Sequence, residues 1–135
     1  MMKTVKQVSS KYILDFALKF FPNFKIDNSP FKKNYVYESD GKIIGFISFS
    51  IIYERAELDY IAVLEEYRGM GIASRLFDKL IIEASRCLNI TLEVRCDNDR
   101  AISFYLKKGF KIVGKREKYY DGIDAYLMIK EIEVR

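Results

Sequence analysis

The order of predicted elements places this chain of 135 residues among α/β proteins of the α+β type, with a mixed, mostly antiparallel central sheet flanked by helices. Two Asp-Gly dipeptides, Asp40-Gly41 and Asp121-Gly122, each separate two apolar-rich runs and predict antiparallel hairpins. A glycine-containing turn at residues 67–71 precedes an amphipathic helix and predicts a single strand–helix–strand crossover. The length predicts a single domain that covers residues 1–135.

The first half of the chain predicts one helix and three strands. Ser9 or Ser10 can cap the helix, and Pro22 and Pro30 then bracket an irregular loop. The strands are expected at residues 35–39, 43–53 and 56–64. The apolar positions of the helix repeat at helical spacing and are Ile13, Phe16, Ala17 and Phe20.

The second half of the chain predicts a helix, a strand, a second helix and a final hairpin. The helix after the glycine turn carries an apolar stripe, and residues 90–95 alternate between apolar and polar as a half-buried strand does. Asn98 is expected to cap a helix over residues 99–108, which Gly109 ends. Strands at residues 111–120 and 123–132 complete the sheet, and the stripe consists of Leu76, Leu80, Ile81 and Ala84.

The composition limits the chemistry that this chain can perform. It contains no histidine, which removes the commonest metal ligand and general base together with any histidine-activated nucleophile. We therefore expect no metal site and look for catalysis by carboxylates, tyrosines, lysines or the backbone. Cys96 is not expected to act as a covalent nucleophile, because no histidine or nearby motif activates its thiol.

Charge and hydropathy indicate a cytoplasmic protein. The net charge of +4 favours an anionic ligand, but the 23 basic residues are spread along the chain among 19 acidic ones, so nucleic acid is not the expected partner. The N-terminus lacks a signal-peptide pattern, and the longest uncharged stretch, residues 43–53, is too short to span a membrane. Two cysteines outside any C-x-x-C arrangement suit a reducing compartment.

The glycine turn is a candidate anion site. Several backbone N–H groups and the positive end of a helix dipole converge where a strand passes through such a turn into a helix, and phosphate is the natural ligand. The residues match neither a P-loop nor a G-x-G-x-x-G fingerprint. A plain strand-to-helix connection explains these glycines equally well.

Two blocks of sequence resemble the GCN5-related N-acetyltransferases (GNAT family). Residues 68–73, Arg-Gly-Met-Gly-Ile-Ala, resemble the family signature R/Q-x-x-G-x-G/A, and residues 98–110 resemble N-x-x-A-x-x-x-Y-x-x-x-G-F. Residues 92–95, 119–120 and 124–128 resemble the RimI-type branch, which acetylates protein N-termini. The resemblance covers residues 43–132 and implies the GNAT fold with acetyl-CoA (coenzyme A) as cosubstrate.

The resemblance also implies which residues hold coenzyme A. Backbone N–H groups of residues 68–74 would surround the pyrophosphate, and the end of the preceding strand would bond the pantetheine arm and face the thioester oxygen. Asn98 would contact the pantetheine through its side chain. The implied residues are Ile61, Ala62, Val63, Arg68, Gly69, Met70, Gly71, Ile72, Ala73, Ser74, Asn98 and Tyr105.

The catalytic residues that the resemblance implies are Glu93 and Tyr105. Glu93 would act as general base through one water, and Tyr105 would protonate the leaving thiolate. By spacing alone, Glu93 also fits the solvent face of a strand, and Tyr105 fits an ordinary half-buried aromatic. Tyr119 and Tyr120 would line the peptide groove, although paired aromatics also stabilise hairpins.

The function that follows is direct transfer of acetyl from acetyl-CoA to the N-terminal α-amine of a protein or peptide, such as a ribosomal protein, in a ternary complex. One alternative is a GNAT enzyme for a small amine, that is, a polyamine, an aminoglycoside or an amino acid; carboxylates lining the acceptor groove would favour a polycation. A second alternative is a non-catalytic acyl-CoA sensor, which would bind coenzyme A without turnover. Both a monomer and a homodimer fit the sequence.

Overall fold

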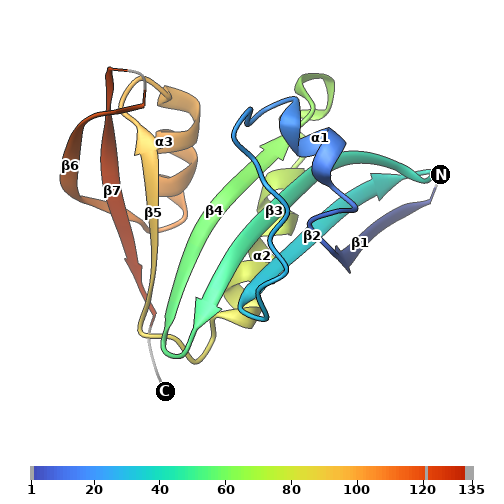
Figure 1. Cartoon of the computed structure of the whole chain (residues 1–135), viewed down its shortest axis with the longest axis horizontal. Coiled ribbons are helices and arrows are strands. Elements are labelled where there is room, and N and C mark those ends of the chain that lie inside the picture. The colour runs from blue at the N-terminus through green and yellow to red at the C-terminus, as the bar shows by residue number, and fades with distance from the viewer. Residues whose placement is uncertain (1, 121, 133–135) are drawn as a thin grey trace.

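The seven strands form one sheet in the order β1-β2-β3-β4-β5-β7-β6 (Figure 1). The computed structural model describes residues 2–120 and 122–132, with Tyr120 described by its backbone alone. In chain order, the elements are β1 Lys3–Val8, α1 Leu14–Leu18, β2 Lys32–Ser39, β3 Lys42–Ile52, β4 Arg55–Val63, the 3₁₀ turn η1 Glu65–Tyr67, α2 Ile72–Glu83, β5 Asn89–Arg95, α3 Asp99–Lys107, β6 Lys111–Tyr120 and β7 Ile123–Glu131.

The predicted mixed sheet is confirmed, because β4 and β5 pair in parallel and every other neighbouring pair of strands is antiparallel. Asp40 and Gly41 have φ values of 52° and 82°, the left-handed conformation that the predicted hairpin turn requires. The second predicted turn includes Asp121, which lies outside the described residues. Among residues 2–120 and 122–132, no helix has both the length and the apolar content needed to cross a membrane.

The first thirty residues differ from the prediction in two ways. An edge strand, β1, pairs antiparallel with β2; its mostly exposed, polar residues carry little of the apolar alternation that identifies a strand. The helix α1 is only five residues long and begins after Ile13, without a capping side chain. Ser10 instead binds the backbone of Asp27, whose N–H lies 2.9 Å from the Ser10 hydroxyl oxygen. That hydroxyl is committed to a loop, so Ser10 does not cap the helix.

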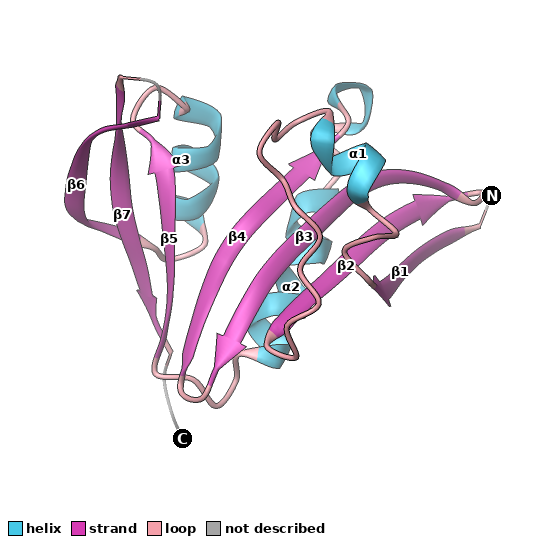
Figure 2. Ribbon diagram, viewed as in Figure 1, coloured by secondary structure: helices cyan, strands magenta, loops and turns pink. Residues whose placement is uncertain are grey.

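Helices α2 and α3 cover one face of the sheet, and α1 covers the other (Figure 2). The larger core lies on the face with α2 and includes Leu76, Phe77 and Leu92. The smaller core joins Phe16 of α1 to Phe46 of β3. We refer to these faces as the α2 face and the α1 face. The alternation of side chains along each strand determines which face each residue occupies.

Strands β4 and β5 pair over only three positions, from Arg55 opposite Asn89 to Glu57 opposite Thr91. Beyond Glu57 the two strands separate (Figure 2). Asp59 is the extra residue of a bulge in β4, where the pairing with β3 shifts by one position. A bulge bends and twists the strand that contains it. The result is an opening between the two halves of the sheet, and the glycine turn follows directly from its β4 side.

Candidate active site

The glycine turn presents an accessible helix N-terminus. Gly69 and Gly71 have φ values of 81° and 79°, and a Cβ added at either position would meet no atom within 4 Å. Gly71 is the N-cap of α2, and no side chain caps that end of the helix. The first amides of a helix have no intrahelical acceptor. The turn therefore offers open backbone donors at the positive end of α2, as a phosphate site requires.

Arg68 is bonded within the turn through both its backbone and its side chain. Its N–H lies 3.2 Å from the carbonyl oxygen of Glu65, within the turn. Its side-chain Nε donates to the carbonyl oxygen of Val63 at 3.2 Å. Arg68 thus anchors the turn to the end of β4, and the donors available to an anion begin at Gly69.

Of the other predicted residues of the turn, some pack against the core and others are accessible to solvent. Ile72 is buried in the core on the α2 face, and Ala73 packs against that core from its edge. Met70 is exposed, while Ser74 is half-buried. Ile72 therefore fixes the start of α2 through its side chain, which leaves its backbone for ligand binding.

The last residues of β4 border the opening between the half-sheets. Ile61, Ala62 and Val63 pair with β3 on one side, and the ladder to β5 has already ended on the other. The side chains of Ile61 and Val63 pack on the α2 face, and that of Ala62 packs on the α1 face. Backbone groups along such a strand edge need hydrogen-bonding partners. This edge suits an extended ligand such as the predicted pantetheine arm.

Glu93 lies in the middle of β5 with its side chain on the α1 face, opposite its buried neighbours Leu92 and Val94. The side chain is 27% exposed, and Oε1 lies 3.1 Å from the Nη2 atom of Arg116 on β6. Oε2 is buried and has no hydrogen-bond partner among the residues that the structure describes. This oxygen is placed to accept a hydrogen bond from a bound water or amine.

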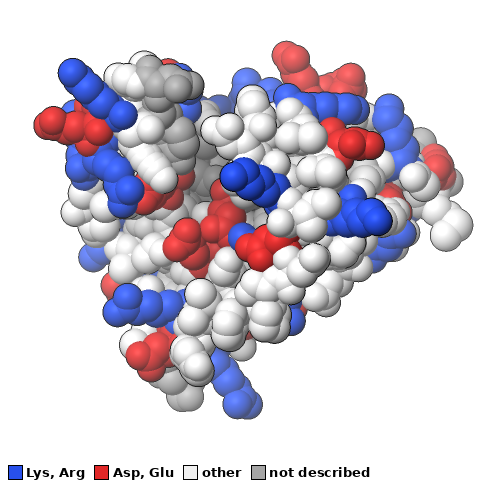
Figure 3. Space-filling model, in the orientation of Figure 1, with Lys and Arg blue, Asp and Glu red and all other residues white. Residues whose placement is uncertain are grey.

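Two further carboxylates, Glu57 and Asp59 of β4, lie near Glu93. Asp59 is paired with Lys32, and its Oδ2 atom accepts a hydrogen bond from the Ser50 hydroxyl at 2.9 Å. Burial raises the pKa of the Glu57 carboxyl, as do the charge and hydrogen bond of Asp59 and the charge of Glu93. Figure 3 shows acidic side chains gathered in the central hollow of the α1 face. The cluster was not predicted, because it depends on the bulge and on pairing between distant strands.

Tyr105 is buried on the α2 face, where its side chain is 7% exposed. Its ring centroid lies 5.7 Å from those of Phe104 and Phe110. The predicted cap of this helix is confirmed, since the Asn98 side chain accepts a hydrogen bond from the N–H of Ala101 at 3.2 Å. The cap and the aromatic contacts together fix Tyr105 on the helix that follows the Glu93 strand.

Tyr119 is partly exposed near the end of β6, where the guanidinium carbon of Arg116 lies 4.6 Å from its ring centroid. Arg116 also pairs with Glu93 and therefore connects Tyr119 to Glu93. Burial raises the pKa of the Tyr60 hydroxyl, and so does the charge of Asp59. The side chain of Tyr120, the other predicted acceptor residue, lies outside the described part of the structure.

The open glycine turn at the start of α2 and the carboxylate on the neighbouring strand agree with the class of protein that the two sequence blocks resemble, the N-acetyltransferases. The chain belongs to the acetyltransferase (GNAT) family, whose family model matches residues 6–110. The family predicted from the two sequence blocks is thereby confirmed.

Similar proteins include two archaeal relatives. An uncharacterized N-acetyltransferase of Methanocaldococcus jannaschii is 39% identical over 101 residues, covering 72% of this chain and 65% of the relative. An N-alpha-acetyltransferase of Sulfurisphaera tokodaii is 37% identical over 110 residues, covering 70% of this chain and 66% of the relative. The chain thus spans slightly less than two-thirds of the length of both relatives.

A solved structure agrees with the fold over almost the whole chain. The ribosomal-protein-S18-alanine N-acetyltransferase of Escherichia coli superimposes with a TM-score of 0.84 and 26% sequence identity, covering 99% of this chain and 96% of that chain. The predicted GNAT architecture is confirmed. The structural agreement also includes the residues before position 43, which lie outside the resemblance seen in the sequence.

Proposed function

We propose that this protein transfers an acetyl group from acetyl-CoA to the N-terminal α-amine of a protein or peptide. The observation that carries the proposal is the Glu93 carboxylate, which has one oxygen paired with Arg116 and the other buried without a described hydrogen-bond partner beside the opening in the sheet. The relatives add support, because one is named as an N-alpha-acetyltransferase and the superimposed structure is named for a ribosomal-protein alanine.

The open helix N-terminus and the β4 edge fit coenzyme A. Amides from Gly69 to Ser74 would hold the pyrophosphate, the backbone of residues 61–63 would bond the pantetheine arm, and the Asn98 side-chain amide would contact it. When bound, acetyl-CoA supplies an acyl group activated as a thioester. The residues of this chain orient that group, accept a proton from the amine and donate one to the leaving sulfur.

Glu93 has the proton-accepting role. An ammonium group cannot attack a thioester, so a proton must leave the amine first. An α-amine has a pKa of about 7.7–8.0, against about 10.4 for a lysine side chain, so the α-amine demands less of a carboxylate base. Glu93 would take this proton through one water on the α1 face. Tyr105 would give a proton to the leaving sulfur from the α2 face.

The charge of the cluster argues against a polyamine acceptor. Three carboxylates gather there, but Lys32 pairs with Asp59, and Arg116 pairs with Glu93. At most about one net negative charge remains, which suits one ammonium group better than several.

The direct test supplies the purified chain with acetyl-CoA and peptides that differ in their first two residues, together with spermidine and an aminoglycoside. Mass spectrometry then locates the acetyl group. We expect it on peptide α-amines. Acetylation of the small amines alone would retain the enzyme class and overturn the acceptor, and tight coenzyme A binding without any product would indicate a sensor.

A Glu93→Gln variant tests the role of the base. We expect turnover to fall by about 10²- to 10⁴-fold, the usual contribution of a general base, with the affinity for coenzyme A nearly unchanged. Steady-state kinetics and calorimetry measure the two quantities. Glu131→Gln is the matched control, because Glu131 is exposed at the far end of β7. Full activity of the Glu93 variant from about pH 6 to pH 9 would remove Glu93 from this role.

A further inference from the structure

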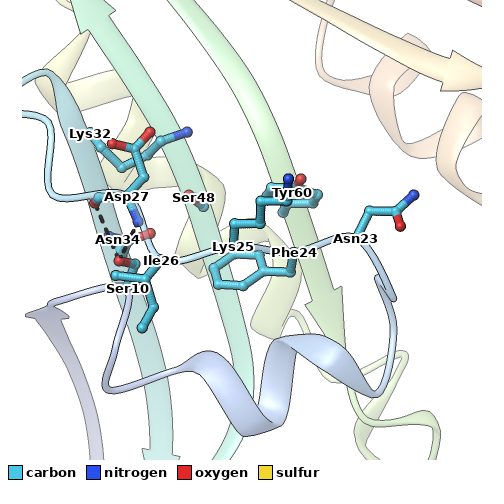
Figure 4. A pocket seen from close by; sticks show the side chains of 10 residues that line it. All are labelled: Ser10, Asn23, Phe24, Lys25, Ile26, Asp27, Lys32, Asn34, Ser48 and Tyr60. Atoms are coloured by element: carbon cyan, nitrogen blue, oxygen red, sulfur yellow. Dashed lines mark hydrogen bonds between the residues drawn. The ribbon is translucent and has the colours of Figure 1, made fainter.

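A cavity of about 330 Å³ lies on the α1 face between the α1–β2 loop and the sheet. Figure 4 shows the loop, with Phe24 and Asp27, crossing the strands that carry Asn34, Ser48 and Tyr60. The Ser10 hydroxyl accepts a hydrogen bond from the N–H of Asp27 at 2.9 Å and donates to its carbonyl oxygen at 3.2 Å. The loop is therefore held to the start of the chain, which fixes this wall of the cavity.

Asn34 gives this cavity an unmet hydrogen-bonding requirement. The residue is 4% exposed and lines the cavity, and its Oδ1 atom has no hydrogen-bond partner within the described part of the chain. Buried side-chain amides nearly always have partners, because an unpaired polar atom away from water is costly. A ligand that brings a hydrogen-bond donor into the cavity would satisfy it.

The cavity adjoins the carboxylate cluster. Lys32 lines the cavity and pairs with Asp59. Tyr60 lines it as well and directly follows Asp59 in β4. Glu57, two residues before Asp59, pairs with Thr91, two residues before Glu93. A peptide whose α-amine reaches Glu93 therefore has the cavity next to its first residues.

On the basis of the proposed function, we propose that this cavity receives a polar, uncharged side chain from the first two residues of the acceptor, namely Ser, Thr, Asn or Gln, which donates a hydrogen bond to Asn34 Oδ1. An aliphatic side chain would leave this oxygen unpaired. An ionised acidic side chain has no donor. A basic side chain would meet the ammonium group of Lys25 at the cavity wall, and the carboxylate of Asp59 is already paired with Lys32.

The test uses two series of peptides on the intact protein. One series carries Ser, Thr, Asn, Gln, Ala, Val, Lys or Glu at the first position, and the other carries them at the second, with the remaining sequence identical. We expect kcat/KM to be at least about tenfold higher for the four polar residues than for Ala and Val in one series.

Asn34→Leu should abolish this preference by lowering kcat/KM for the polar peptides to the level of the Ala and Val peptides. Asn28→Leu, an exposed position in the same loop, is the matched control. Asn34→Ser serves as a smaller second variant that keeps a hydroxyl acceptor, and it should retain part of the preference. Thermal unfolding of each variant checks that it is folded.

The outcomes separate the two proposals. Acetylated α-amines with no advantage for the polar residues, or a preference that survives in a folded Asn34→Leu variant, would overturn the cavity assignment and leave the proposed function standing. A failure to acetylate any α-amine would overturn both.

Discussion

Glu93 differs from an ordinary strand carboxylate in the surroundings of its two oxygens. Oε1 pairs with Arg116, and Oε2 is buried without a hydrogen-bond partner among the described residues. The sequence indicated Glu93 only by resemblance, because alternation along β5 fits a solvent-facing residue equally well. The pairing with Arg116 could not be predicted, since it depends on how β6 and β7 pair beside β5.

A Tyr105→Phe variant tests the proposed proton donor. Tyr105→Phe should slow turnover by about 10²-fold or more, because it removes the proton donor to the leaving sulfur. The loss should be largest at high pH, where solvent supplies few protons. Steady-state rates across a pH series measure it. Since the ring remains in its aromatic contacts, the variant should stay folded, and an unchanged rate would exclude Tyr105 as the acid.

Individual elements show where local sequence is sufficient and where it is not. Asp40-Gly41 and the Asn98 cap are correctly predicted, because each conformation depends on neighbouring residues alone. The edge strand β1 was missed and α1 was expected to begin too early, because the pairing of β1 with β2 and the bonding of Ser10 to Asp27 are contacts between distant segments.

A hydrogen bond between β2 and α2 makes the stability of the fold depend on pH. The Tyr35 hydroxyl donates to Glu83 Oε2 at 2.7 Å, and burial with this bond raises the pKa of Tyr35 to about 12 from 10.0. A raised pKa contributes stability that is fully present below pH 10 and is lost as the pH rises toward about 12. We expect Tyr35→Phe to lower the free energy of unfolding by about 1 kcal/mol at neutral pH.

Urea unfolding of both proteins at several pH values measures this effect. The difference in stability between the wild type and Tyr35→Phe should shrink between pH 10 and about 12. A difference that stays constant over this range would show that the Tyr35 hydroxyl has no folded-state preference for its proton.

Across the whole molecule, the two half-sheets share only a short parallel ladder, so the core on the α2 face must hold them together. Phe77 of α2 is central to it, with its ring centroid 5.9 Å from those of Phe104 and Phe110 on the other half. The opening that the site needs is therefore compatible with a single cooperative core.

Phe77→Ala tests this arrangement. Phe77 is 2% exposed, and we expect the variant to lose about 3–5 kcal/mol of the free energy of unfolding. Ile82→Ala is the control on the same helix, because Ile82 is 66% exposed and should change stability by less than about 0.5 kcal/mol. Chemical denaturation followed by two probes measures both. A small loss, or separate transitions for the two halves, would contradict a shared core.

The sequence by itself determined the hairpin turn at Asp40-Gly41, the cap and end of α3, the order of the elements from β2 onward and the glycine turn. These features depend on the conformational preferences of adjacent residues. Tertiary structure alone decided the divergence of β4 from β5, the grouping of Glu57 and Asp59 near Glu93, and the cavity at Asn34. Each depends on register, on a bulge or on a loop packed across strands, and such contacts join residues that are distant in the chain.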